Sequence, residues 1–165
     1  MVTETPGREV SNQKRVANVI CSERIEIHAP IHLVWDLLVD LERYEEWNPF
    51  TYRMEGSLQE GASIKLSVRL GGKDRTEVEQ IKEVSKPHKL SWGMKLGASF
   101  LLVSLREQCL EDASDESCYY TTTQTFGGLL APLVRFLVGR HIRTGFDEMS
   151  NALKKRAEMI FQEQS

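Results

Sequence analysis

The sequence lacks features that mark several common classes of protein. Its 165 residues include three cysteines, an odd number without the spacing of zinc ligands, which argues against a disulfide scaffold and against a zinc site. No stretch reaches the roughly 18 consecutive apolar residues that a membrane-spanning helix requires. Residues 1–15 lack the apolar core of a secretory signal. We therefore expect a cytoplasmic protein that does not insert stably into membranes.

An excess of positive charge is also missing. The formal net charge is -3, so the chain as a whole has no electrostatic reason to bind nucleic acid or an anionic membrane. Arg135, Arg140, His141 and Arg143 do cluster near the C-terminus, but a solvated and partly salt-bridged helix face is the simpler interpretation. We predict no nucleic-acid partner.

The familiar catalytic and cofactor motifs are absent as well. The sequence contains no G-x-S-x-G elbow, P-loop, H-E-x-x-H or dinucleotide-binding glycine fingerprint. His28 and His32 lie four residues apart, but Pro30 and an expected strand-to-helix transition separate them, which argues against a shared metal. From the sequence we assign no catalytic residue, no metal ligand and no cofactor.

A long helix near the C-terminus is the dominant element that the sequence predicts. It spans Leu129 to Ile160 and has Pro132 in its first turn, where proline is tolerated. Its second half has one apolar face with helical spacing, formed by Ile142, Phe146, Met149, Leu153 and Ile160. Its first half is apolar on all sides and is expected to be covered nearly all round: Leu129, Leu130, Leu133, Val134, Phe136, Leu137 and Val138.

Two glycines, Gly139 and Gly145, interrupt this helix. Each lowers helix stability by about 1 kcal/mol relative to alanine. We interpret them as positions of close packing, with a bend of the helix as the alternative.

Alternation of apolar and polar residues before the helix predicts strands. The clearest strand is Ser63 to Leu70, whereas the next one shifts phase between Val78 and Ile81, as a β-bulge would. Two short helices, near 31–38 and 41–47, follow the first strand, and Asp40 is expected to cap the second. Strands are expected at 19–28, 50–55, 63–70, 75–84, 90–96, 99–110 and 119–126.

These elements predict the domain organisation. Successive hairpins imply an antiparallel sheet, and segregated helices imply an α+β arrangement. We expect one domain at residues 18–165, preceded by a flexible tail at residues 1–17.

Two cysteines, Cys109 and Cys118, flank an acidic turn that the sequence predicts at Glu111 to Ser117. A hairpin centred on Ala113 and Ser114 would place Cys109 opposite Cys118. Reduced, packed cysteines are the favoured interpretation, and a cross-strand redox pair is the alternative.

Short segments along the chain match a known pattern. They are residues 25–30 (IEIHAP), 34–38 (VWDLL), 41–50 (LERYEEWNPF), Gly61 at the start of a strand, 90–92 (LSW) after Lys86-Pro87, and 124–128 (QTFGG). Together they resemble START-related helix-grip proteins, the superfamily that includes polyketide cyclase/dehydrase-like and lipid-transfer domains. The resemblance covers roughly Val19 to Ala157 and is more specific for fold than for activity, because one fold hosts many functions.

This resemblance implies a helix-grip fold, in which a curved antiparallel sheet of about seven strands wraps around the long helix. It also implies an apolar cavity between helix and sheet that holds a small hydrophobic or amphipathic molecule. We therefore expect binding or transfer of such a ligand without catalysis, by a monomer or a homodimer. One alternative is a cyclase or dehydratase that uses the same cavity with an acid/base such as Tyr120, His141 or Glu107. Another is a chaperone-activator-like module that acts through its outer surface.

The candidate cavity residues fall into three groups. The candidate walls are Tyr52, Met54, Val68, Trp92, Met94, Phe100, Leu102 and Phe136. Trp47 is interpreted as an anchor between the short helices and the sheet, with a place in the cavity rim as the alternative. The polar candidates on the last two strands are Arg106, Gln108, Tyr120 and Gln124. Arg140, His141 and Thr144 are candidates at the cavity mouth, with surface exposure as the simpler interpretation for Arg140 and a structural role for His141.

The orientation of the last two strands is open at this level. If Arg106, Gln108 and Leu110 face inward together with Tyr120, Gln124 and Phe126, polar groups enter the cavity. A shift of one residue would turn all of them outward. An inward Arg106 would need a carboxylate partner or an anionic ligand group, because a buried unpaired charge is unfavourable.

Overall fold

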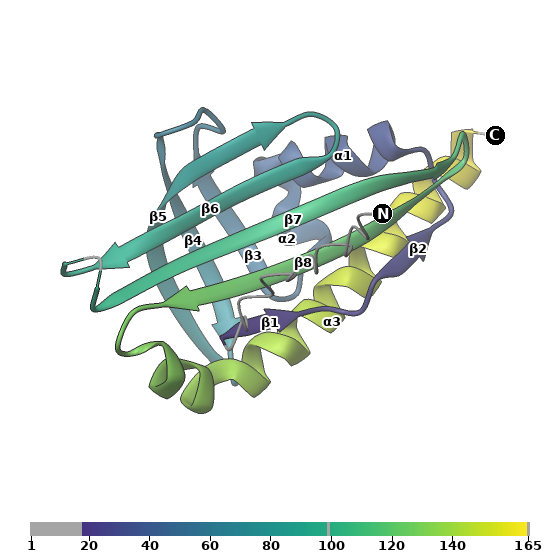
Figure 1. The fold of residues 1–165 in the computed structure, drawn as a ribbon. Coiled ribbons are helices and arrows are strands. Elements are labelled where there is room, and N and C mark those ends of the chain that lie inside the picture. The colour runs from purple at the N-terminus through teal and green to yellow at the C-terminus, as the bar shows by residue number, and fades with distance from the viewer. Residues whose placement is uncertain (1–17, 99, 165) are drawn as a thin grey trace, which may run out of the picture.

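The computed structural model describes residues 18–98 and 100–164, so the tail predicted at residues 1–17 lies outside the described residues. These residues form eight strands and one long helix, with short helices after the second strand (Figure 1). The helical elements are α1 (Ile31–Val39), the 3-10 turn η1 (Leu41–Arg43), α2 (Tyr44–Trp47) and α3 (Ala131–Gln164). The strands are β1 (Val19–Cys21), β2 (Ile25–Ile27), β3 (Thr51–Gly56), β4 (Ser63–Leu70), β5 (Lys73–Ser85), β6 (Lys89–Leu96), β7 (Leu102–Ser114) and β8 (Ser117–Gly127).

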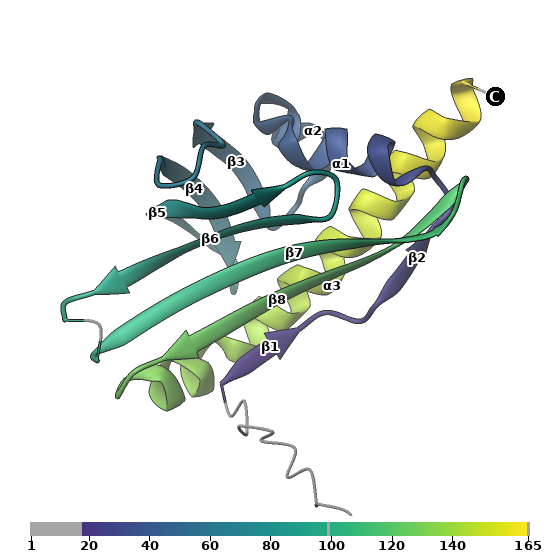
Figure 2. The ribbon, with the colours of Figure 1, turned by 45° about the horizontal axis from the view of Figure 1, so that its top comes forward.

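The strands form one antiparallel sheet in the order β1-β8-β7-β6-β5-β4-β3, and β2 also pairs with β8. The sheet curves around α3, and α1 and α2 lie beside the C-terminal half of that helix (Figure 2). An ion pair joins them there, between Arg156 of α3 and Glu46 of α2 at 2.7 Å. The predicted α+β helix-grip architecture is confirmed, with the first predicted strand divided into β1 and β2.

The second half of α3 packs as its apolar spacing predicts. Ile142, Phe146, Met149 and Leu153 are all buried against the sheet, whereas Ala157 rather than Ile160 completes the buried face. Nine residues of this helix are buried in total, and most of them lie after Gly139. The apolar core therefore lies under the C-terminal two thirds of the helix.

The first half of α3 contradicts the expectation that it would be covered nearly all round. Leu129 just before the helix is 75% exposed, and Phe136 is 85% exposed. Only one side of these turns faces the sheet, through Val134 and Val138, which are half-buried. The first half stays exposed because the short helices α1 and α2 cover only the C-terminal half of α3.

Strand β5 shows no phase shift between Val78 and Ile81. Val78 is 64% exposed and Ile81 is 1% exposed, because residues three apart on a regular strand point to opposite faces. The prediction of a bulge there was wrong, since it assumed that both apolar side chains point inward. The register shift lies further on, between Ile81 and Glu83.

The β7–β8 hairpin turns later than the sequence suggested. Cys109 lies opposite Thr121, and Cys118 lies opposite Asp112, so the two cysteines do not face each other. Both strands continue past the predicted turn to Ser114 and Ser117, which moves the centre of the hairpin to Asp115 and Glu116. The predicted hairpin centre was wrong, and all three cysteines are free thiols.

The connection from the short helices to β3 is held by Asn48. Its side-chain Oδ1 accepts hydrogen bonds from the backbone N–H groups of Phe50 (3.1 Å) and Thr51 (2.9 Å). Asp40 was expected to cap the second helix, but its side chain makes no capping hydrogen bond and pairs with Arg43 instead at 3.5 Å. Asn48 thus fixes where Phe50 and Thr51 enter the sheet.

The two glycines of α3 have different surroundings, which predicts opposite effects of alanine. A Cβ at Gly145 would overlap the ring of Phe50, whereas a Cβ at Gly139 would make ordinary contacts of 3.5 Å with Arg135 and Ile20. Gly145→Ala should lower the free energy of unfolding by about 1–3 kcal/mol through overpacking. Gly139→Ala should raise it by up to about 1 kcal/mol through helix propensity.

Urea denaturation of the two variants beside the unmodified protein checks this pair. Equal destabilisation by both substitutions would show that the contact with Phe50 is not what requires glycine at position 145.

Candidate functional site

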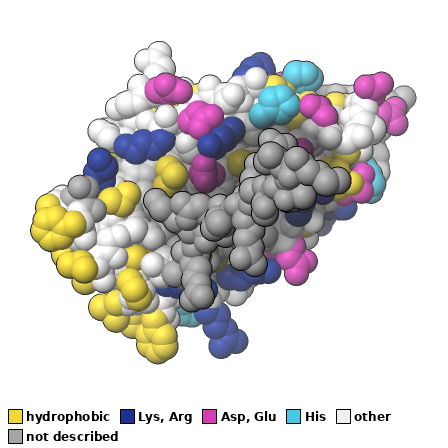
Figure 3. All heavy atoms as spheres, in the orientation of Figure 1, with side chains coloured by type: hydrophobic (Ala, Val, Ile, Leu, Met, Phe, Trp, Pro, Cys, Tyr) yellow, Lys and Arg dark blue, Asp and Glu magenta, His cyan; other side chains and the backbone are white. Residues whose placement is uncertain are grey.

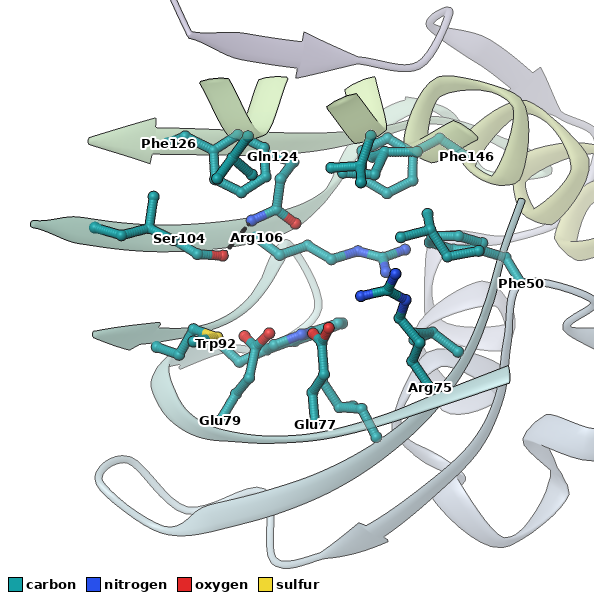
Figure 4. A pocket seen from close by; sticks show the side chains of 18 of the residues that line it. Phe50, Arg75, Glu77, Glu79, Trp92, Ser104, Arg106, Gln124, Phe126 and Phe146 are labelled. Carbon is teal, nitrogen blue, oxygen red and sulfur yellow. Dashed lines mark hydrogen bonds between the residues drawn. The ribbon is translucent and has the colours of Figure 1, made fainter. Parts of the chain in front are cut away.

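A cavity of about 300 Å³ lies between the first half of α3 and the sheet. Most of its wall is apolar, and its polar groups come mainly from β5, β7 and β8 (Figure 4). The lining residues are Phe50, Leu66, Val68, Leu70, Arg75, Glu77, Glu79, Trp92, Met94, Leu102, Ser104, Arg106, Gln124, Phe126, Val134, Leu137, Val138, Ile142 and Phe146. An apolar enclosure with a few convergent polar groups is typical of a small-molecule site.

Strand register places the polar groups in rows on the inner face. Trp92, Arg106 and Gln124 are direct cross-strand neighbours on β6, β7 and β8. Because side chains alternate along a strand, partners across neighbouring strands share a face. Of the two orientations left open by the sequence, the structure shows the inward one: Arg106, Gln108 and Gln124 are 4%, 1% and 9% exposed.

Arg106 lies at the inner end of the cavity. Its Nη1 donates to Thr51 Oγ1 at 3.1 Å, and its Nη2 donates to Met149 Sδ at 3.1 Å. Its Nε has no hydrogen-bond partner among the described residues. Asn48, which fixes Thr51, therefore also helps to position the guanidinium.

Three aromatic rings surround the Arg106 guanidinium. Its carbon lies 4.5 Å from the ring centre of Phe146, 5.3 Å from Trp92 and 5.4 Å from Phe50, all within cation–π range. Burial lowers the pKa of Arg106, although an arginine remains cationic. No carboxylate of the described residues forms an ion pair with it. The cavity therefore presents a positive charge that the protein leaves without a paired anion.

Glu79 of β5 is the second buried charged residue in the wall of the cavity. It is 7% exposed, and its Oε2 has no hydrogen-bond partner among residues 18–98 and 100–164. Burial, with a smaller contribution from Glu77, raises the pKa of Glu79 to about 7, and the charge of Arg106 partly opposes this rise. Figure 4 shows Arg75, Glu77 and Glu79 pointing from β5 into the cavity.

Two pairs of buried polar side chains near the cavity form hydrogen bonds with each other, whereas Gln108 Nε2 has no partner among the described residues. Gln124 Nε2 donates to Ser104 Oγ at 2.6 Å, within the cavity wall. The Tyr120 hydroxyl donates to Gln108 Oε1 at 2.6 Å, deeper in the core. Burial raises the pKa of Tyr120, so its phenol stays neutral. Arg106 Nε and Glu79 Oε2 are thus the fully buried side-chain atoms without a hydrogen-bond partner among the described residues that line the cavity.

Six of the sequence-derived candidates line this cavity, and the others do not. Those that line it are Val68, Trp92, Met94, Leu102, Arg106 and Gln124. Met54, Gln108 and Tyr120 are buried in the core outside it, and Trp47 packs on Tyr44 with ring centres 5.1 Å apart, as an anchor would.

The remaining candidates point away from the cavity. Phe100 and Phe136 are 67% and 85% exposed, so their expected role as walls is not what the structure shows. Tyr52 turns outward toward Arg69, Arg140 and Thr144 are exposed, and the ring of His141 lies against Gly71 in the β4–β5 turn. Phe136, Arg140 and Thr144 point away because they lie on the outer side of α3. Val134, Val138 and Ile142 occupy the side that faces the cavity.

The polar residues of β5 were missed by sequence reasoning. Arg75, Glu77 and Glu79 are two residues apart and in phase with buried Ile81, which is the signal that places them on the inner face. The sequence alone does not reveal this, because an inward-facing Val78 would place the three polar side chains on the outer face.

No helix of the described residues has the length and apolarity needed to cross a membrane. Among these residues, no group of three His, Cys, Asp or Glu side chains is arranged to hold a metal ion.

Comparisons with known proteins agree with this geometry. The model of a family described as polyketide cyclase/dehydrase and lipid transport matches residues 19–158. No curated protein sequence matches the chain.

Solved structures share the fold at low sequence identity. The aromatase/cyclase Zhui from Streptomyces sp. R1128 has a TM-score of 0.68 at 18% identity, covering 85% of this chain and 93% of its own. A START superfamily protein from Mycobacterium smegmatis has a TM-score of 0.65 at 15% identity, covering 86% and 98%. Norcoclaurine synthase from Thalictrum flavum, in complex with dopamine and hydroxybenzaldehyde, has a TM-score of 0.64 at 15% identity, covering 100% and 99%. At these identities the likeness concerns the fold alone.

Proposed function

Because the chain belongs to the polyketide cyclase/dehydrase and lipid transport family, we propose that it binds and carries a small amphipathic molecule in the cavity between α3 and the sheet. The apolar part of the ligand lies along the walls formed by Leu66, Val68, Val134 and Val138. Its polar group lies at the inner end, beside Arg106 and Glu79. Catalysis is not required for this role.

The observation that carries the proposal is the unpaired charge of Arg106. A guanidinium that is 4% exposed and lacks a carboxylate partner is unfavourable in the empty protein, although the three rings offset part of this. An acidic ligand group would supply the missing anion and take the free Nε–H donor. We therefore infer that the ligand carries a carboxylate or a comparable anion at one end.

Arg106→Leu tests the proposal. The variant should bind a fluorescent fatty acid about 30-fold or more weakly, because losing one partner of a buried charge pair typically lowers affinity by roughly 2–5 kcal/mol. Binding of the matched fatty alcohol should change much less. Fluorescence titration with both probes measures the difference.

The matched control is Arg69→Leu, the same substitution at a half-exposed arginine that pairs with Asp74 outside the cavity. It should leave both affinities unchanged. Equal affinities of the unmodified protein and Arg106→Leu for the acid would remove Arg106 from the site, and failure of both probes to bind would contradict the carrier role itself.

The raised pKa of Glu79 supports a second candidate function, a cyclase or dehydratase reaction. A carboxyl group with a pKa near 7 is suited to accept or donate a proton at neutral pH. Glu79 would remove a proton from a carbon beside a carbonyl, and Arg106 would stabilise the enolate oxygen. Incubation with a poly-β-ketone thioester distinguishes the two functions: turnover that is lost in Glu79→Gln supports the enzyme, and stoichiometric binding without product supports the carrier.

A further inference from the structure

We propose that one end of the molecule, at the mouth of the cavity, docks on an anionic lipid membrane surface. This docking end consists of Leu96, Phe100, Leu129, Leu133, Phe136 and Leu137. Such docking does not depend on which ligand the cavity holds.

Exposed apolar side chains are concentrated at this end. Leu96 and Phe100, from the β6–β7 connection, are 48% and 67% exposed, and Leu133 and Leu137 of α3 are 54% and 61% exposed. Among the described residues, the other large hydrophobic side chains with comparable exposure are Val78 and Met159, which lie on β5 and near the C-terminus. In Figure 3, apolar side chains gather at the end where the β6–β7 connection and the start of α3 lie.

The backbone holds the two segments of the docking end together. The N–H of Leu129 donates to the carbonyl of Phe100 at 2.9 Å, and the N–H of Leu130 donates to that of Leu101 at 3.0 Å. Gly128, with φ of +95°, allows this close approach, because a Cβ there would lie 2.7 Å from the Leu101 carbonyl oxygen. The exposed side chains therefore form one preorganised surface.

On α3 the exposed apolar residues form a single stripe that ends in a cation. Leu133, Phe136, Leu137 and Arg140 are spaced three, four and seven residues apart, so they share one face of the helix. A helix with such a face lies in the plane of a membrane interface, with its apolar side chains in the acyl boundary and its cations at the headgroups. The stripe has the composition of an interfacial helix.

The charge of both segments selects an anionic membrane as the partner. The sequence has no Asp or Glu between Glu83 and Glu107, or between Glu116 and Asp147. These two stretches contain Lys95 and Arg140, which are exposed and form no ion pair among the described residues. The net charge of -3 conceals this local excess of positive charge. A second copy of the chain would bring two such cationic ends together, whereas an anionic leaflet complements them.

The position of the cavity agrees with membrane docking. Leu137 lines the cavity and is also 61% exposed, so it forms part of the mouth. Docking by this end would place the mouth against the acyl boundary, where an amphipathic molecule could pass between bilayer and cavity without crossing water.

Vesicle sedimentation tests the proposal. The full chain is mixed with phosphatidylcholine vesicles, with or without phosphatidylglycerol, at low and high salt. We expect binding to the anionic vesicles that weakens with salt, because exposed charges are screened. Leu133→Ser/Phe136→Ser should reduce binding roughly tenfold, since two apolar side chains leave the interface. Lys95→Glu/Arg140→Glu should reduce it at least about fivefold, as expected for cations near an anionic leaflet.

Val78→Ser is the matched control, because Val78 is an apolar side chain of similar exposure at 64% on the outer face of β5. It should bind vesicles as the unmodified protein does, and fatty-acid binding in the cavity should persist in Leu133→Ser/Phe136→Ser. Absence of binding to anionic vesicles, or equal loss in Val78→Ser, would overturn the proposal. So would a dimer in sedimentation velocity that Leu133→Ser/Phe136→Ser dissociates while vesicles fail to bind, because the surface would then serve a second copy.

Discussion

Replacing Glu79 with glutamine should stabilise the protein at pH 8 by about 3 kcal/mol and leave its stability at pH 4 nearly unchanged. The folded state raises the pKa of this carboxyl from the ordinary value of 4.5 to about 7, because the group is buried beside Glu77. Each unit of such a shift corresponds to about 1.4 kcal/mol between the two protonation states. Glutamine has nearly the same shape and never carries the charge.

The direction of the pH dependence follows from proton binding. Between pH 4.5 and about 7 the folded state binds more protons at Glu79 than the unfolded state does, so this group lowers the free energy of unfolding as the pH rises. The penalty is absent below the unfolded pKa and complete above the folded one. A carboxylate held in an ion pair would show the opposite slope.

Urea denaturation of Glu79→Gln and the unmodified protein from pH 4 to pH 8 measures this difference. Glu77→Gln is the comparison variant and should diminish the pH dependence without removing it, because burial raises the pKa of Glu79 more than the charge of the half-buried Glu77 does. The free energies of unfolding of Glu79→Gln and the unmodified protein could differ by the same amount at every pH. That result would show that the carboxyl of Glu79 titrates normally and is not buried as described.

The affinity for a carboxylate amphiphile should fall as the pH rises above about 7, by up to about 100-fold between pH 7 and pH 9. Protonated Glu79 donates a hydrogen bond to the ligand carboxylate beside Arg106, whereas ionised Glu79 repels it. Binding is then linked to uptake of one proton, which limits the slope to about tenfold per pH unit. The bound anion raises the pKa of Glu79 further.

Fluorescence titrations of the fatty acid at several pH values test this linkage. Glu79→Gln should give a nearly flat profile above pH 7, and the matched fatty alcohol should show little pH dependence with the unmodified protein. Glu77→Gln should retain the slope but shift it to lower pH, because the charge of Glu77 contributes to the raised pKa of Glu79. A slope that persists in Glu79→Gln would assign the proton to another group and separate Glu79 from the ligand.

Much of the fold could be predicted from local patterns. The bounds of β4, Ser63–Leu70, agree with the sequence because a strand with one wet face and one buried face must alternate at every residue. The buried face of α3 at Phe146, Met149 and Leu153 was predictable for the same reason, with a helical period. The split of the first strand and the centre of the β7–β8 hairpin were less accessible, because they depend on pairing with β8.

The candidate site could be predicted in part. Arg106 and Gln124 were identified because their strands alternate, but the sequence left both orientations open until their neighbours were known. Glu79 was missed, since an acidic residue two positions before buried Ile81 reads as a surface residue unless the phase of the whole strand is established.

What the sequence determined by itself was the α+β class, the order of most elements and the inward side of the regularly alternating ones, such as β4 and the second half of α3, because these follow from backbone periodicity and burial of apolar side chains. The tertiary structure alone decided where the core ends. It left Phe136 exposed while Val138 lines a cavity, and it placed Glu79 near Arg106 although the two are far apart in the chain. The physical reason is that burial depends on which elements lie over a side chain, and those elements are distant in sequence.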